Sequence, residues 1–120
     1  MRVLIGIEDS DRGMQALEAA AERAREAGDE LTVAVYTVSD ESLEETTAAV
    51  RDRIKTLDVD VEIIQIEEEP GSKLVEIAER EDFDQVVLSG GQRSPLGKIK
   101  LDSVHEFVLL NARTTVKLVR

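Results

Sequence analysis

The sequence predicts an α/β fold: an open, doubly wound sheet of five parallel strands, in the order 3-2-1-4-5, with helices on both faces. Two observations carry this prediction. Strand-like and helix-like patterns alternate strictly along the 120 residues, and strict alternation is typical of parallel sheets with crossover helices. The first strand-like segment is also nearly continuous in apolar residues, as expected for a strand covered on both sides. We expect one domain over residues 1–120.

The first half of the chain supplies two strands and two helices. Residues 3–7 (Val-Leu-Ile-Gly-Ile) predict a buried strand. Ser10 can then cap a helix that runs to about Ala27, where Gly28 provides the stop. Residues 31–38, rich in Val, Thr and Tyr, predict the second strand. A helical apolar stripe follows, made of Leu43, Val50, Ile54 and Leu57.

The second half continues the alternation. Residues 59–66 predict a third strand, and the Pro-Gly-Ser sequence at 70–72 opens a third helix. Residues 85–88 predict a fourth strand, and residues 103–111 a fourth helix. Residues 114–119 form the last strand, which we expect at an edge of the sheet. An edge strand presents unpaired backbone groups, so we expect a homodimer formed through it.

Charge excludes several classes of partner. Acidic residues number 26 against 15 basic ones, of which 10 are Arg and 5 are Lys, and the net charge is −11. Such a field repels nucleic acid and anionic lipid, so we expect neither as a partner. The excess of acidic over basic residues and the preference for Arg over Lys predict a protein of a salt-accumulating microbe. The alternative is an ordinary acidic cytosolic protein. Without cysteine or a long apolar run, we expect a cytoplasmic location.

Catalytic and metal-binding constellations are missing from the sequence. The one histidine, His105, lies in the last predicted helix, where we expect a surface or capping residue rather than a base. Residues 67–69 (Glu-Glu-Glu) are better explained as a solvated strand end than as cation ligands. Residues 39–42 (Ser-Asp-Glu-Ser) similarly indicate a helix start rather than a metal cluster. We therefore expect no catalytic residues and no metal.

The most informative segment is the loop at residues 89–103, which leads from the fourth strand into the last helix. A strand, a glycine-bearing loop and a helix N-terminus together form the usual geometry for holding phosphate. In a doubly wound sheet, a ligand binds beyond the carboxyl ends of the strands where strand order reverses. The candidate nucleotide site therefore comprises Glu8, Val38, Ser89, Gly90, Gly91, Gln92, Asp102 and Ser103.

Over essentially its whole length the chain resembles the universal stress protein family. Residues 2–10 resemble the family's first strand, which usually ends in Asp-Gly-Ser, although here the ending is Glu-Asp-Ser. Residues 102–108 and 115–119 resemble its final helix and strand. The resemblance implies a Rossmann-like fold, a role in the stress response and, as in many members, pairing through the last strand.

The same resemblance implies a degenerate nucleotide motif. Nucleotide-binding members carry Gly-x2-Gly-x9-Gly followed by Ser or Thr. With Ser103 as the terminal hydroxyl, the three glycines fall on Ser89, Gln92 and Asp102. A side chain at such a position obstructs the close approach of backbone to phosphate, and the Asp102 carboxylate fills the anion site with the protein's own charge. Ser103 and Glu106 also have capping-box spacing, which would occupy the serine structurally.

Three function classes follow. The leading one is a non-enzymatic regulatory or interaction module with no cofactor and weak or no nucleotide binding, acting on a regulatory protein partner. The second is an ATP-binding switch of the same family. A shifted register would support it, because Gly90, Gly91 and Gly97 keep the loop pliable. Three cationic side chains of the same loop could then meet phosphate: Arg93, Lys98 and Lys100. An adenylating or hydrolytic enzyme is the third class.

Overall fold

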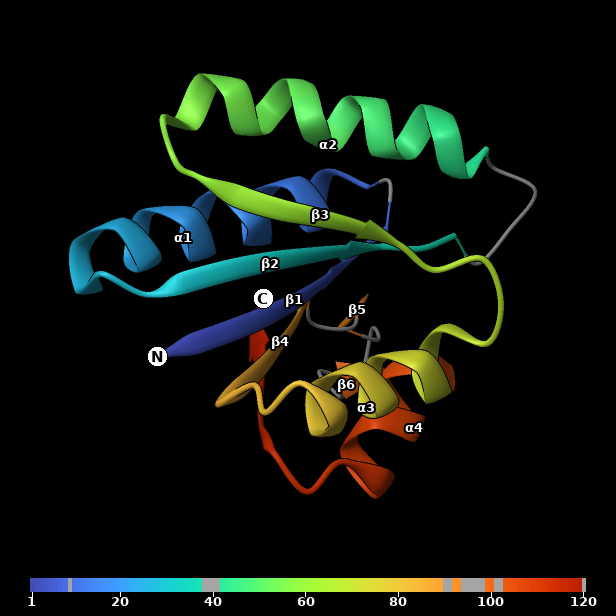
Figure 1. The fold of residues 1–120 in the computed structure, drawn as a ribbon. Helices are drawn as coiled ribbons and strands as arrows, with labels where there is room; N and C mark the ends of the chain where they lie inside the picture. Colours follow the sequence, from blue (N-terminus) through green and yellow to red (C-terminus); the bar gives the residue numbers. More distant parts are fainter. Residues whose placement is uncertain (9, 38–41, 90–91, 94–98, 101–102, 120) are drawn as a thin grey trace.

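The structure, a computed structural model, describes residues 1–8, 10–37, 42–89, 92–93, 99–100 and 103–119. Seven strands and four helices lie within these residues (Figure 1). In chain order they are β1 (Arg2–Ile7), α1 (Asp11–Ala27), β2 (Glu30–Val35), α2 (Leu43–Leu57), β3 (Val61–Gln65), α3 (Pro70–Arg80), β4 (Gln85–Ser89), β5 (Gln92–Arg93), β6 (Ile99–Lys100), α4 (Ser103–Asn111) and β7 (Thr115–Val119).

Five of the strands form one parallel sheet in the order β3-β2-β1-β4-β7. Ile5 at the centre of β1 pairs with Val33 on one side and Val87 on the other. When the strands of this sheet are counted along the chain, the order is the predicted 3-2-1-4-5. The predicted fold class is therefore confirmed.

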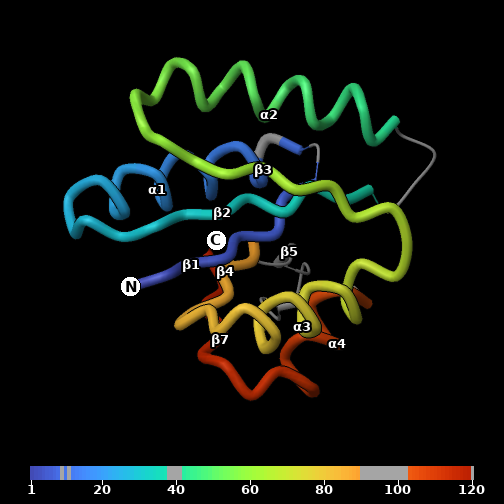
Figure 2. The backbone as a smooth tube through the Cα atoms, in the orientation of Figure 1, coloured from blue at the N-terminus to red at the C-terminus, as the bar shows by residue number. Residues whose placement is uncertain are grey.

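Helices cover both faces of the sheet. Figures 1 and 2 show α1 and α2 on one side and α3 and α4 on the other. Successive β1 side chains point to opposite faces, so Ile5 packs in a cluster with Leu17 of α1, whereas Leu4 packs in a cluster with Leu74 of α3 and Val108 of α4. Burial on both faces explains why β1 is apolar without alternation. Each such fully buried side chain contributes about 1.5–3 kcal/mol.

The helix ends agree with the predicted caps. Ser10 precedes α1 in an extended conformation, and Gly28 ends that helix at φ +73°, where its amide donates to the Ala24 carbonyl. Glycine adopts this left-handed conformation without the steric cost that a Cβ would bring. Ser42 caps α2, with its hydroxyl accepting from the Glu45 amide at 3.3 Å. The predicted helix start therefore lies at Ser42; residues 38–41 lie outside the described residues.

Two strands are shorter than predicted. β2 ends at Val35 rather than at residue 38, and β3 spans Val61–Gln65 rather than residues 59–66. The reason is the length of the neighbouring strand: β1 ends at Ile7, which pairs with Val35. A strand persists only while it has a partner, so the ladder continues as single bonds from the Tyr36 amide to the Ile7 carbonyl and from the Ile66 amide to the Val35 carbonyl.

The segment after β4 contains a short hairpin that the sequence did not predict. Gln92 of β5 pairs with Lys100 of β6, and Arg93 pairs with Ile99, in antiparallel register. Two-residue strands are too short to leave a period-2 apolar pattern, so no sequence signal marked them.

Candidate functional site

The candidate site lies at the carboxyl edge of the sheet, where strand order reverses. β1 is flanked by β2, the next strand of the sheet along the chain, and by β4, which is reached only after β3. Such a reversal leaves a crevice between the two diverging connections. The described residues at this edge include Glu8 after β1, Thr37 after β2 and Ser89 at the end of β4.

The end of β1 is closely packed against the first turn of α1. The Ser10 hydroxyl accepts a hydrogen bond from the Gly13 amide at 2.9 Å, and the Ser10 carbonyl accepts one from the Met14 amide at 3.0 Å. A Cβ added to Gly13 would lie 2.5 Å from the Glu8 carbonyl oxygen, so the helix meets the strand backbone directly. The protein's own serine therefore caps the N-terminus of α1 beside the half-buried Glu8.

Ser89 lies inside β4 rather than in an open loop. It is the last residue of the strand, pairs with Val119 of β7, and is 3% exposed. Its backbone is held by the strand ladder and its side chain occupies buried space. The position that the nucleotide motif would give to glycine is therefore already filled.

A groove of about 630 Å³ opens on the α3 and α4 side of this edge. The ends of β2, α3 and α4 contribute its lining: Thr37, Glu69, Pro70, Gly71, Ser72, Ser103, Val104 and Phe107. Ser103 begins α4 and its side chain is exposed; it makes no hydrogen bond with any other residue that the structure describes. The predicted pairing of Ser103 with Glu106 in a capping box was therefore wrong.

The α3 side of this groove was missed by sequence reasoning. Gly71 lies in the first turn of α3, and a Cβ added there would be 3.0 Å from the Phe107 Cβ. The two helices are thus in close contact where they frame the groove. The glycine inside a helix start was the available signal, since such a residue often permits close packing. The sequence alone could not identify α4 as the neighbour.

Four of the predicted site residues, Val38, Gly90, Gly91 and Asp102, lie outside the described residues. Gln92 belongs to the hairpin strand β5. The structure brings Glu8, Ser89 and Ser103 to the same edge of the molecule.

His105 corrects a prediction. It was expected at the surface or in a capping role, but it is 3% exposed, with the apolar residues Val104 and Val108 buried on the same helix. Positions 104, 105 and 108 share one helical face, so the histidine faces inward with that stripe.

Among the residues that the structure describes, no group of three or more His, Asp or Glu side chains could hold a metal ion. None of the described helices is both long and apolar enough to cross a membrane.

Comparison with known proteins gives consistent matches over the whole chain. A universal stress protein from Archaeoglobus fulgidus is 27% identical, with a TM-score of 0.83 over 100% of this chain and 98% of that one. A universal stress protein in complex with cAMP is 24% identical, with a TM-score of 0.78 over 100% and 96% of the two chains. A universal stress protein from A. fulgidus in complex with dAMP is 24% identical, with a TM-score of 0.77 over 100% of this chain and 98% of that one. No curated protein matches the chain.

The family comparison agrees with the fold. The model of the universal stress protein family matches residues 1–120. The sheet order and the similarity to solved universal stress proteins agree with this match. The chain therefore belongs to the universal stress protein family.

Proposed function

We propose that the protein is a small, non-enzymatic regulatory or interaction module of the stress response that binds nucleotide weakly or not at all. The observation that carries this proposal is the position of Ser89, buried in β4 and paired with Val119. A glycine at the first motif position would let a phosphate approach the backbone closely. In this chain the buried Ser89 occupies that position, and its side chain obstructs the approach. Gln92 and Asp102 replace the other two glycines.

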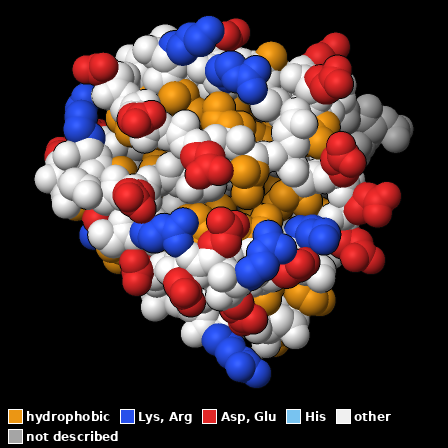
Figure 3. Space-filling view, viewed as in Figure 1, with side chains coloured by type: hydrophobic (Ala, Val, Ile, Leu, Met, Phe, Trp, Pro, Cys, Tyr) orange, Lys and Arg blue, Asp and Glu red, His pale blue; other side chains and the backbone are white. Residues whose placement is uncertain are grey.

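The neighbouring groups also disfavour an anion. The Ser10 hydroxyl takes up one first-turn amide of α1, which reduces the donors available at that helix N-terminus. Glu8 adds a carboxylate at the end of β1, within a chain of net charge −11. Acidic side chains are spread across the face seen in Figure 3. A triphosphate would meet repulsion at this edge.

Burial of the one histidine supports a non-enzymatic role. His105 is buried on the inner face of α4, beside Val104 and Val108, and cannot meet a substrate as a general base without exposing that stripe. We propose no catalytic residue, no metal and no resident cofactor for this protein.

An ATP-binding switch is the alternative, and two observations favour it. Related structures contain dAMP or cAMP, and the exposed Ser103 side chain lines the groove without an internal hydrogen-bond partner among the described residues. In this alternative the loop at 89–103 would hold phosphate through Gly90 and Gly91.

Calorimetric titration with ATP distinguishes the module that binds nucleotide weakly or not at all from the ATP-binding switch. We expect a dissociation constant above about 100 μM, equivalent to less than about 5.5 kcal/mol. The double variant Gln92→Gly with Asp102→Gly should bind at least about tenfold more tightly, because it removes a side chain and a charge from the phosphate position. Asp58→Gly is the matched control: it removes a carboxylate at φ +50° at the end of α2. Micromolar binding by the native protein would refute the proposal.

The setting of the module is part of the same proposal. We place it in the cytoplasm of a salt-accumulating, haloarchaeal-type microbe, as a homodimer that contacts a regulatory protein. Support for the dimer is the position of β7 at the edge of the five-stranded sheet, because an edge strand has free backbone groups on one side. Support for the habitat is the balance of 26 acidic to 15 basic residues.

A further inference from the structure

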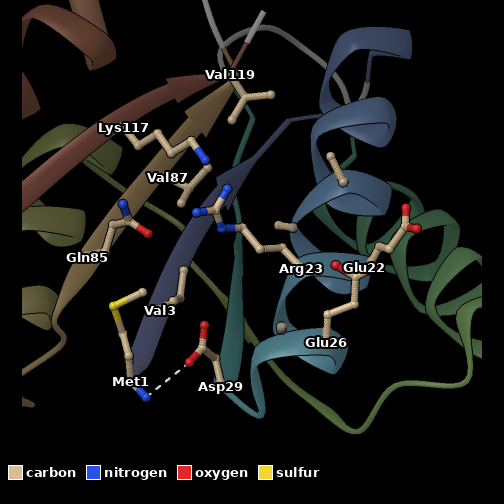
Figure 4. A pocket seen from close by; sticks show the side chains of 13 residues that line it. Met1, Val3, Glu22, Arg23, Glu26, Asp29, Gln85, Val87, Lys117 and Val119 are labelled. Atoms are coloured by element: carbon tan, nitrogen blue, oxygen red, sulfur yellow. Dashed lines mark hydrogen bonds and ion pairs between the residues drawn. The ribbon is translucent and has the colours of Figure 1, made fainter.

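A second groove, of about 380 Å³, lies on the opposite side of the sheet from α3 and α4. One wall is α1, and the floor is the part of the sheet that extends beyond α1 toward β7 (Figure 4). Val3, Val87 and Val119, from three adjacent strands, form the apolar floor. The volume is in the range of small-molecule sites.

Two cationic side chains meet over this floor. Figure 4 shows the Arg23 guanidinium, from α1, and the Lys117 ammonium, from β7, pointing toward one another above Val87. Neither side chain forms an ion pair or hydrogen bond with another residue in the described part of the chain. Lys117 is half-buried. Arg23 is exposed, so Lys117 loses more solvation than Arg23 does, and the two like charges repel one another unless an anion lies between them.

Three acidic residues line the groove, Glu22, Glu26 and Asp29, and none of them forms an ion pair with Arg23 or Lys117. The Glu22 carboxylate points away from the two cations (Figure 4). Asp29 pairs instead with the N-terminal ammonium at 3.1 Å, at the other end of the groove. In a chain with 26 carboxylates, two facing cations without one are the unusual feature of this surface.

We propose that this groove binds a small amphipathic carboxylate. The head group lies between Arg23 and Lys117, where it receives charge-assisted hydrogen bonds from both. The aliphatic or aromatic body lies on Val3, Val87 and Val119. This site is separate from the nucleotide edge and does not depend on the function proposed there.

Displacement of a fluorescent dye tests the proposal. Anilinonaphthalene sulfonate, which carries an aromatic body and an anionic group, reports occupancy, and octanoate competes with it. We expect one displaceable dye per chain and a preference of at least about tenfold for octanoate over uncharged 1-octanol, because the alcohol lacks the charge that the two cations neutralise. Equal competition by the two compounds would overturn the proposal.

Matched variants locate the binding. Arg23→Gln and Lys117→Gln should each weaken octanoate binding about fivefold or more. Arg25→Gln removes an exposed arginine of the same helix outside the groove and should have no effect. Ala19→Phe fills the groove from an exposed position and should abolish binding, whereas Ala27→Phe, exposed on α1 but outside the groove, should not.

Amide chemical-shift mapping with octanoate completes the test. Shifts confined to residues around Val87, Lys117 and Val119 would support the site. Shifts centred on the exposed Leu110 of α4 would contradict it, since they would place the probe on another apolar surface. The dimer proposed above would pair β7 through its edge backbone groups, whereas the groove lies on the face of the sheet. Dye binding that falls below one per chain as the dimer forms would therefore contradict the site, because the second copy would then cover the groove.

Discussion

At the scale of single residues, the junction of β1 and α1 shows how closely the candidate edge is packed. Gly13 lies in the first turn of α1, with room for no larger side chain beside the Glu8 carbonyl. Ser10, three residues earlier, closes the same turn by capping it. Together they bring the helix N-terminus against the strand end, which places Glu8 at the crevice.

Gly13→Ala should destabilise the protein. Helix propensity alone would make this substitution stabilising by about 1 kcal/mol. The added Cβ, however, would lie 2.5 Å from a backbone oxygen that cannot move freely, and overpacking of this kind costs about 1–3 kcal/mol. Urea denaturation should therefore show a lower midpoint.

Gly28→Asn is the matched control for that measurement. A Cβ there has nothing within 4 Å, and asparagine tolerates the left-handed conformation, so the midpoint should hardly change. An increase in stability for Gly13→Ala would mean that the close approach is not present.

Ser10→Ala should cost about 1 kcal/mol of unfolding free energy, because it removes an N-cap whose bond to the Gly13 amide is 2.9 Å long and partly buried. Ser42→Ala is the comparison. Its exposed cap bond is 3.3 Å long, so its loss should cost less. Equal costs, measured in the same urea titrations, would show that burial and bond length do not control the strength of these caps.

At the scale of helices and strands, the alternation of patterns was enough to predict the sheet and its four helices, because long apolar segments report directly on burial. Ends were predicted where a cap residue marks them, as at Ser10 and Gly28. Strand ends were missed where the length of the neighbouring strand sets them, as at Val35, which pairs with the last residue of β1. The β5–β6 hairpin left no pattern, and His105 was misplaced because polarity was given more weight than its position between buried neighbours.

For the candidate site, the sequence predicted the edge but not its shape. Parallel topology brings the ends of β1 and β4 together whatever their side chains, so Glu8 and Ser89 could be placed in advance. The groove between α3 and α4 depends on the contact of Gly71 with Phe107. Contacts of that kind join segments far apart in the chain, and one sequence does not reveal them.

The edge strand β7 predicts the state of association. Sedimentation equilibrium at high salt should give about twice the 13.3 kDa chain mass, because the unpaired side of β7 can pair with that of a second copy. Deleting residues 116–120 should leave monomer or insoluble protein. A full-length monomer at about 100 μM, a concentration at which even a weak dimer forms, would overturn the dimer.

At the scale of the whole molecule, the net charge should make stability depend on salt. With a net charge of −11 on 120 residues, self-repulsion should weaken the compact state at low ionic strength. The melting temperature should rise as KCl increases from tens of millimolar to about 1 M, where the Debye length is about 3 Å.

A variant with fewer charges provides the control for salt. Replacing the exposed Glu62, Glu67 and Glu68 with glutamine should flatten the dependence on KCl, since it removes part of the repulsion that salt screens. A melting temperature of the native protein that does not respond to KCl would contradict both the repulsion and the halophilic assignment.

We propose that this chain keeps the family fold while its own side chains fill the edge where a phosphate site was predicted. The most direct measurement is the nucleotide content of the purified protein, obtained by denaturing it and analysing the supernatant by chromatography. We expect far less than one nucleotide per chain, because Ser89, which is buried, Gln92 and Asp102 stand at the three motif positions that would otherwise be glycine. Close to one ATP or AMP per chain would contradict it and establish the switch instead.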